Sequence, residues 1–343
     1  MKEIANRLDN ISFIKTIMMI TVVLYHCFLF FGGNWFTPVE PAQSADYLYN
    51  IAQWMKTFHI QAFAMASGFL FYYLMTEKGR YNDPKNDIKK RAKRLLIPYL
   101  FTSVLWVIPI GIFFYHYSFG EIFSKFILMT GPAQLWFLIM LFMVFLFFEL
   151  IGKRVKLSFG NLVLIYIITT IVGGLLSRVN ISYFQLAASV KYILFFYLGG
   201  YIYKNRKKIS WKQVLPMIGM IAVLYTLIIC FGKSDNTVIK YGVDFVEPLL
   251  SVLEVSVIYF TCSRLVQKCK GIVNNRFYKV LEGNSFGIYL FHQQIIYFVI
   301  FWLNGTVPPI VLALCLFVIA LFVSLVMSLL LRRNKVTRFM FGL

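Results

Sequence analysis

Ten apolar segments, each long enough to cross a lipid bilayer, constrain this chain more than any other feature of its sequence. A transmembrane helix needs about 20 mostly apolar residues. Segments of this kind lie near residues 11–31, 54–75, 96–115, 135–151, 159–177, 186–203, 213–231, 246–262, 285–303 and 308–331. The sequence therefore predicts an all-α integral membrane protein built as a bundle of about ten transmembrane helices.

The composition agrees with this prediction. Hydrophobic residues make up 59% of the 343 residues and charged residues 14%, whereas soluble domains carry about 25% charged residues. Such a chain cannot cover a water-facing surface, so most of its surface must face lipid. The segment that begins near Ile11 has no cleavage site after it, and we interpret it as a retained first span rather than a signal peptide.

The positive charges indicate how the helices are oriented. The net charge is +20, but the basic residues occur in short connections between apolar segments, which argues against nucleic acid as a partner. Of the lysine and arginine residues, 27 lie at the termini and in every second connection, against four in the opposite connections. Cytoplasmic loops carry this excess. We therefore expect both termini in the cytoplasm and a multi-pass protein of the cell (inner or plasma) membrane.

The connections are too short to form a soluble domain of their own. The longest on the predicted outer side have about 20 residues. We expect a single transmembrane domain over residues 1–343, with no appended soluble domain. Any chemistry must then be built from the spanning helices themselves.

The first span carries two ionisable residues, Lys15 and His26. Such groups are costly inside a bilayer and often mark functional sites. Eleven residues on a helix cover about 16 Å and return to nearly the same face. One stripe would therefore carry a cation near the cytoplasm and an imidazole in the outer half. The alternative is a lysine that extends to the membrane surface and a histidine that bonds a neighbouring helix.

The second span carries His59 near its predicted outer end, at a depth similar to that of His26. A structural hydrogen bond and a contact with substrate are both compatible with this position. Further along the same span, Ser67 and Gly68 form a pair of small residues that favours close packing of helices.

A basic segment precedes the third span, and within it Arg91 and Arg94 are three residues apart. On a helix they share one face, where two guanidinium groups can hold phosphate groups at the membrane edge. A topological anchor with no ligand is the alternative. Two further ionisable residues, His292 and Glu254, lie within later spans without an assigned role.

No motif in the sequence predicts a metal site or nucleotide hydrolysis. The five cysteines have no C-x-x-C spacing, and the templates of P-loop ATPases, zinc hydrolases and serine hydrolases do not occur. We therefore expect no metal.

Five segments in order resemble the acyltransferase 3 family of polytopic membrane O-acyltransferases, which modify cell-surface glycans. Lys15 to His26 is similar to the family's basic-x10-His motif. The other four segments are Phe58–Leu70 (F-H-x-P-x-F-x-x-x-S-G-F), Arg91–Tyr99 (R-x-x-R-L-L-x-P-Y), Leu135–Leu138 (L-W-F-L) and Asn284–His292 (S-x-G-I-Y-L-x-H). The chain departs from the pattern at Gln61, where proline is usual, and at Ser12, where an acidic residue is frequent.

The resemblance implies transfer of an acyl group, usually acetyl, from cytoplasmic acetyl-CoA or another acyl-CoA to a sugar hydroxyl. Lys15, Arg91 and Arg94 would then bind the donor's phosphates. His26, and with it His59, would be catalytic, since an imidazole can take the proton of an attacking hydroxyl near neutral pH. His26 would act either as a general base or as a transient carrier of the acyl group.

The partners implied are the lipid bilayer, a glycan acceptor such as a capsular or exported polysaccharide, and the machinery that makes or exports it. Two functions without acyl chemistry remain as alternatives. A transporter or flippase of lipid-linked sugars would also need ten or more spans, although no repeat symmetry supports it. A glycan polymerase or export partner is the other alternative, although the large external loop common in polymerases is missing.

Overall fold

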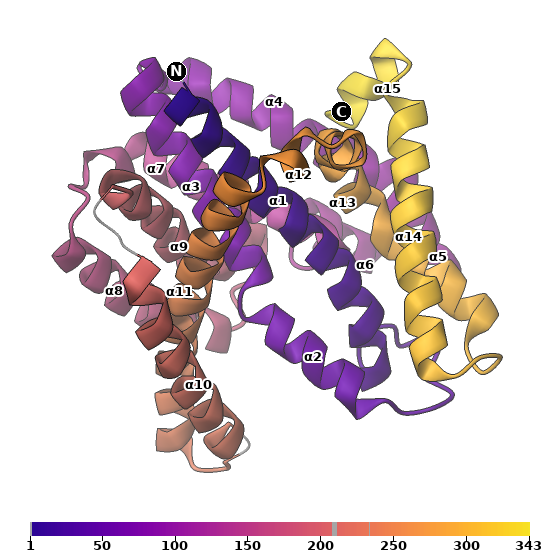
Figure 1. Ribbon diagram of the computed structural model, residues 1–343. Coiled ribbons are helices and arrows are strands. Elements are labelled where there is room, and N and C mark those ends of the chain that lie inside the picture. Colours follow the sequence, from indigo (N-terminus) through magenta and orange to yellow (C-terminus); the bar gives the residue numbers. More distant parts are fainter. Residues whose placement is uncertain (1, 208–210, 233) are drawn as a thin grey trace. The chain divides into compact units, whose positions relative to one another are not determined.

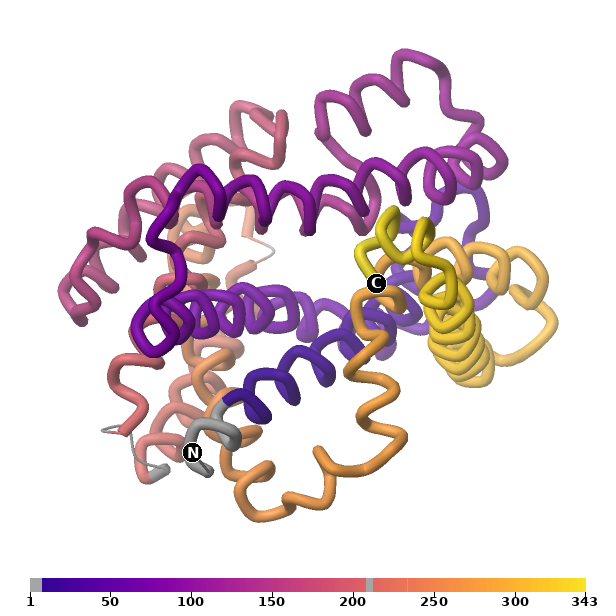
Figure 2. Tube along the Cα trace, turned by 90° about the horizontal axis from the view of Figure 1, so that it is seen from above, coloured from indigo at the N-terminus to yellow at the C-terminus, as the bar shows by residue number. Residues whose placement is uncertain are grey.

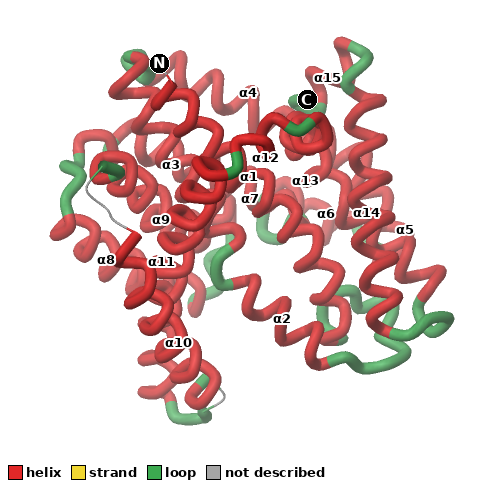
Figure 3. Tube along the Cα trace, viewed as in Figure 1, coloured by secondary structure: helices red, strands yellow, loops and turns green. Residues whose placement is uncertain are grey.

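The structure, a computed structural model, describes residues 2–207, 211–232 and 234–343. The described residues form helices and loops, with no β-strand (Figure 3). Within these described residues, ten helical segments are long and apolar enough to cross a membrane, and each overlaps one of the ten predicted spans. The prediction of an all-α polytopic membrane protein is confirmed.

The α-helices are labelled in chain order in Figure 1. Their bounds are Lys2–Leu29 (α1), Asp46–Lys56 (α2), His59–Lys78 (α3), Pro84–Thr102 (α4), Ile108–Tyr115 (α5), Phe119–Ile122 (α6), Trp136–Leu150 (α7), Phe159–Arg178 (α8), Leu186–Asn205 (α9), Val214–Phe231 (α10), Thr237–Lys268 (α11), Lys270–Asn274 (α12), Arg276–Leu303 (α13), Pro309–Leu331 (α14) and Lys335–Met340 (α15).

The second predicted span is two helices rather than one. It begins at Asp46 rather than near residue 54, and α2 ends at Lys56 before α3 starts at His59. At the break the Thr57 hydroxyl donates to the Trp54 carbonyl, 2.7 Å away, and so bonds a group at the end of α2. His59 is therefore the first residue of α3 and does not lie within a continuous helix.

The chain divides into two compact units that alternate along the sequence. Unit 1 comprises Met1–Lys15, Ile60–Lys89 and Met143–Asn275, and unit 2 comprises Thr16–His59, Lys90–Phe142 and Arg276–Leu343.

In unit 1 the packing of α3 against α9 depends on glycine. A Cβ atom on Gly68 would lie 1.9 Å from the Phe196 carbonyl oxygen, and one on Gly199 would lie 2.0 Å from the Met65 carbonyl oxygen. The two backbones therefore touch, as small residues permit in membrane proteins. The packing role predicted for Gly68 is confirmed.

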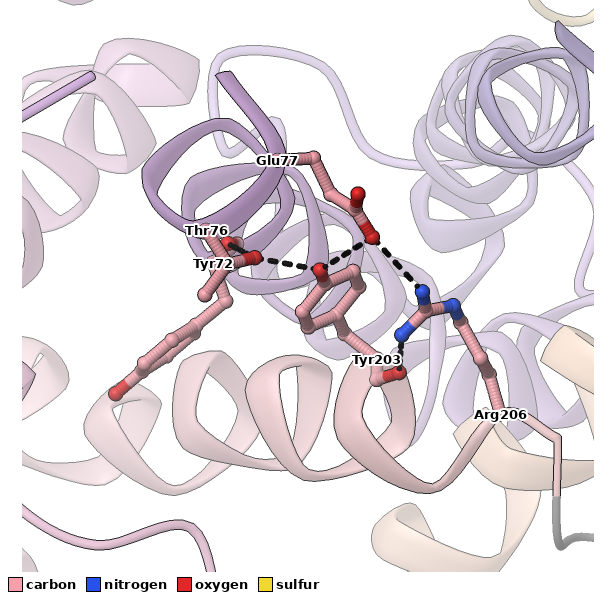
Figure 4. A network of polar contacts seen from close by, with 5 residues as sticks. All are labelled: Tyr72, Thr76, Glu77, Tyr203 and Arg206. Atoms are coloured by element: carbon pink, nitrogen blue, oxygen red, sulfur yellow. Dashed lines mark hydrogen bonds and ion pairs between the residues drawn. The ribbon is translucent and has the colours of Figure 1, made fainter. Parts of the chain in front are cut away.

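A polar network joins the C-terminal ends of the same two helices (Figure 4). The Tyr203 hydroxyl donates to Glu77 at 3.0 Å, and the Arg206 guanidinium pairs with the same carboxylate at 3.0 Å. Thr76 and Tyr203 share a 2.5 Å hydrogen bond. The network fixes the ends of α3 and α9 to each other.

In unit 2 the long helices α13 and α14 form an antiparallel hairpin. Ser328 of α14 donates to the Asn284 side chain of α13 at 2.9 Å, and Arg332 donates to the Gly283 carbonyl at 2.7 Å. The chain then folds back so that its C-terminus ends beside α13, and a Cβ atom on Gly287 would lie 3.0 Å from Leu343 (Figure 2).

Candidate functional site

The candidate site is built on the end of α1 that lies in unit 2. His26 lies in the last turn of α1, three residues before its last residue, and is partly buried. The ring lies 5.3 Å from the ring of Trp35 and 5.0 Å from that of Tyr25, measured between centroids. His26 therefore lies among aromatic rings within unit 2.

A second histidine, from α13, contacts His26 directly. His292 is fully buried, and its Nε2 lies 3.1 Å from Nδ1 of His26. Its Nδ1 lies 3.1 Å from the Ile288 carbonyl oxygen and 2.9 Å from that of Tyr289. The two imidazoles form a pair between residues 266 positions apart in the chain.

These contacts determine where the protons of the neutral pair lie. A carbonyl oxygen only accepts, so Nδ1 of His292 carries the proton and its Nε2 has a lone pair. His26 Nδ1 faces that lone pair and also the Val22 carbonyl, 3.0 Å away, so it carries a proton as well. The Nε2 atom of His26 is then left unprotonated, as a base or nucleophile requires.

His59 belongs to the same surroundings through Tyr25. The His59 and Tyr25 ring centroids are 4.6 Å apart. Nδ1 of His59 lies 2.5 Å from the Met55 carbonyl, across the break between α2 and α3, and the side chain is buried. The structure thus gives His59 the structural hydrogen bond that was one of its two alternatives, next to a residue that also contacts His26.

A cluster of buried amides continues along α13 and was not predicted from the sequence. The Gln134 amide donates to the Gln294 side chain at 2.7 Å and to the Leu290 carbonyl at 2.8 Å, while Gln294 donates back to Gln134 at 3.0 Å. Tyr289 donates its hydroxyl to the Gln134 carbonyl. A signal was present, because Gln293 and Gln294 are adjacent amides inside an apolar segment.

The predicted donor-binding residues are placed as follows. Lys15 is partly buried on α1, eleven residues before His26 on the same helix, and belongs to unit 1. Arg91 and Arg94 lie in the unit 2 part of α4; Arg91 is partly buried and Arg94 is exposed. The arginine pair therefore shares a helix and a unit, and its binding of a donor stays a prediction.

No metal-binding group is found within residues 2–207, 211–232 and 234–343: no three His, Cys, Asp or Glu side chains are grouped as metal ligands there. The site consists instead of imidazoles, aromatic rings and amides. Its chemistry would be proton transfer or nucleophilic attack by an imidazole.

Taken together, the ten helices of spanning length in the described part of the chain and the contact between His26 and His292 define a polytopic membrane protein that carries a polar site within its helices. The model of the acyltransferase 3 family, described as an acyltransferase domain, matches residues 8–329. The chain belongs to this family and is a membrane acyltransferase. No curated protein and no solved structure matches it.

Proposed function

We propose that this membrane acyltransferase transfers an acetyl group from cytoplasmic acetyl-CoA to a hydroxyl of a cell-envelope or exported polysaccharide. The observation that carries the proposal is the His26–His292 pair, whose hydrogen bonds leave Nε2 of His26 with a lone pair. Such an atom can accept the proton of a sugar hydroxyl as the hydroxyl attacks.

The donor supplies an acyl group activated as a thioester. As the hydroxyl oxygen bonds to the acyl carbon, its proton passes to Nε2 of His26. The bond from that carbon to sulfur breaks, and the same proton passes to the departing thiolate. His26 is positively charged between these events, and the Val22 carbonyl and the His292 lone pair face its Nδ1–H. Both contacts favour the charged form.

The other residues have supporting roles in the proposal. Arg91 and Arg94 bind donor phosphates, since guanidinium groups on one helical face can each engage a phosphate. Lys15 adds a third positive charge on the helix that carries His26. His59 holds Tyr25, and through it the aromatic surround of His26, in place.

The test is incorporation of label from radioactive acetyl-CoA into polysaccharide isolated from the source cells, catalysed by membranes that contain the protein. We expect base-labile label in the polysaccharide, because esters hydrolyse in mild base. Transport of lipid-linked sugar with no label from acetyl-CoA or any other acyl-CoA would favour the transporter or flippase alternative and reject the proposal.

The same assay, run without the polysaccharide acceptor, distinguishes the two possible roles of His26, general base and transient acyl carrier. If His26 carries the acyl group, label stays on the protein after rapid denaturation. If His26 is a general base, the protein stays unlabelled while the complete reaction proceeds.

A further inference from the structure

Unit 1 contains a cavity with several polar and charged residues in its wall, which the acyl-transfer proposal does not use. Its volume is about 320 Å³, and it lies between α8, α9 and α11, with Gln61 of α3 in its wall. By the predicted topology, α8 ends and α9 begins on the outer side, so the cavity is on that side. The 32 residues of α11 span about 48 Å, whereas a bilayer core is ~30 Å thick. This helix therefore extends beyond the bilayer core.

Four charged side chains line the cavity, two of each sign. Arg178 pairs with Asp244 at 2.7 Å, and its guanidinium lies 3.7 Å from the centre of the Tyr241 ring. Lys191 and Glu247 also line the wall, and neither forms an ion pair among the described residues. Of the four, Lys191 and Glu247 lie within predicted spans, where charged side chains are functional candidates.

The hydroxyl groups of the wall present acceptor oxygens. Thr169, Ser177 and Ser251 each donate to the carbonyl four residues earlier, at 2.7, 2.8 and 3.2 Å. Their protons are thereby used and their lone pairs remain. The hydroxyl oxygen of Thr170, also in the wall, is buried and has no hydrogen-bond partner among the residues that the structure describes. A buried polar atom of this kind calls for a ligand or water.

The wall of the cavity combines hydrogen-bond donors, hydrogen-bond acceptors and charges of both signs, and this combination restricts which ligands fit. Amide and cationic groups donate, while carboxylates and the hydroxyl oxygens accept. A sugar hydroxyl both donates and accepts, so an uncharged, hydroxylated ligand can pair with both kinds of group. A phosphate would gain no net attraction there, because the two carboxylates of the wall offset its two cations.

We propose that this cavity binds one or two residues of a neutral glycan and serves as a docking site for the acceptor polysaccharide. Gln61, where the family pattern has proline, supplies one amide of its wall. The identity of the ligand as an acceptor rests on the proposed acetyl transfer; its neutral and hydroxylated character rests on the cavity itself.

The direct test is ligand-observed saturation-transfer NMR with the full chain in phosphatidylglycerol nanodiscs. The probes are cellotetraose, maltotetraose and N-acetylchitotetraose. We expect at least one of them to bind wild type. Thr170→Val should weaken that binding about 5- to 30-fold, the cost of one hydrogen bond to a buried partner. Glu247→Gln, which keeps the shape and removes the charge, should also weaken it.

Thr170→Val separates a binding role from a structural one. The hydroxyl makes no hydrogen bond within the described part of the chain, so its replacement by a methyl group should leave the unfolding temperature unchanged or raise it while sugar binding falls. The matched control is Thr226→Val on α10. Its hydroxyl donates to the Ala222 carbonyl on an exposed face, and sugar binding should not change.

A fourth compound, sn-glycero-3-phosphoethanolamine, is tested alongside the sugars as a lipid headgroup. Three outcomes would overturn the proposal: no tetrasaccharide binds, binding is unchanged in both cavity variants, or only the headgroup compound binds, which would indicate a lipid headgroup site. The two proposals fail separately. Sugar binding without acyl transfer in wild type would retain the cavity's role as a glycan site and reject acetyl transfer. Acyl transfer with no sugar binding would reject only the cavity.

Discussion

At the scale of single residues, the position of one proton connects His292 to His26. Because two carbonyls hold the proton on His292 Nδ1, its Nε2 can only accept from His26 while the pair is neutral. His292 is therefore a positioning residue in the proposed reaction. It orients the imidazole of His26 and keeps Nε2 of His26 as the free lone pair.

Replacement of His292 tests this role. We expect His292→Leu to lower kcat about 10- to 100-fold, the value of one hydrogen bond to a charged group, with little change in KM for acetyl-CoA. His292→Gln should recover part of the loss, because its amide oxygen can accept from His26. Equal kcat values for His292→Leu and wild type would show that the pair is only structural.

Replacement of Arg91 and Arg94 should change the affinity for acetyl-CoA rather than the rate of acetyl transfer. We expect the double variant Arg91→Ala with Arg94→Ala to raise KM for acetyl-CoA about 10- to 100-fold through lost charge-assisted bonds to phosphate. The matched control is Lys89→Ala with Lys93→Ala, which removes the same charge from exposed positions of α4. An equal rise in KM in both double variants would show that only the total positive charge of this region matters. No change in KM in either variant would mean that the arginines serve only as a topological anchor.

The sequence predicted the position of His26 but not its contact with His292. The apolar first span predicted that Lys15 and His26 share one helix, and α1 contains both. Their spacing of eleven residues predicted that they also share one face of it. The contact between His26 and His292 joins distant segments of the chain. Periodicity carries no information about such pairing, so His292 had no role assigned beforehand.

At the scale of elements, close contact between α3 and α9 stabilises unit 1. The Phe196 carbonyl occupies the space that a side chain at position 68 would need. We expect Gly68→Ala to destabilise the protein by about 1–3 kcal/mol and to lower the unfolding temperature, because the backbones must separate. Gly219→Ala on α10 is the matched control. A Cβ there meets nothing within 4 Å, so stability should hold or rise slightly. A fall equal to that of Gly68→Ala would refute the packing account.

The break between α2 and α3 shows where helix prediction from apolar length fails. No proline or glycine occurs between Asp46 and Ser67, so nothing in the sequence marks an interruption. The break depends on tertiary contacts and on local bonds such as that from Thr57 to Trp54. Ten spans were predictable because each requires only length and hydrophobicity.

At the scale of the whole molecule, the charge distribution predicts which loops face the cytoplasm. We expect Asp235→Cys, between α10 and α11, to react with a membrane-impermeant maleimide on intact cells in a cysteine-free background. Lys85→Cys, at the start of α4, should react only after the cells are permeabilised. Both positions are exposed. The reverse pattern would invert the topology and place the proposed outer cavity on the cytoplasmic side.

The central claim is that the lone pair on Nε2 of His26 carries out acyl transfer. The most direct measurement compares the initial rate of acetyl transfer to polysaccharide for wild type, His26→Asn and His116→Asn. Asparagine keeps a donor near the Nδ1 position and removes Nε2, and His116 is an exposed residue outside the site that accepts the same change. We predict a loss of about 10²- to 10⁴-fold for His26→Asn and none for His116→Asn. A His26→Asn protein that acetylates at the wild-type rate would contradict the account.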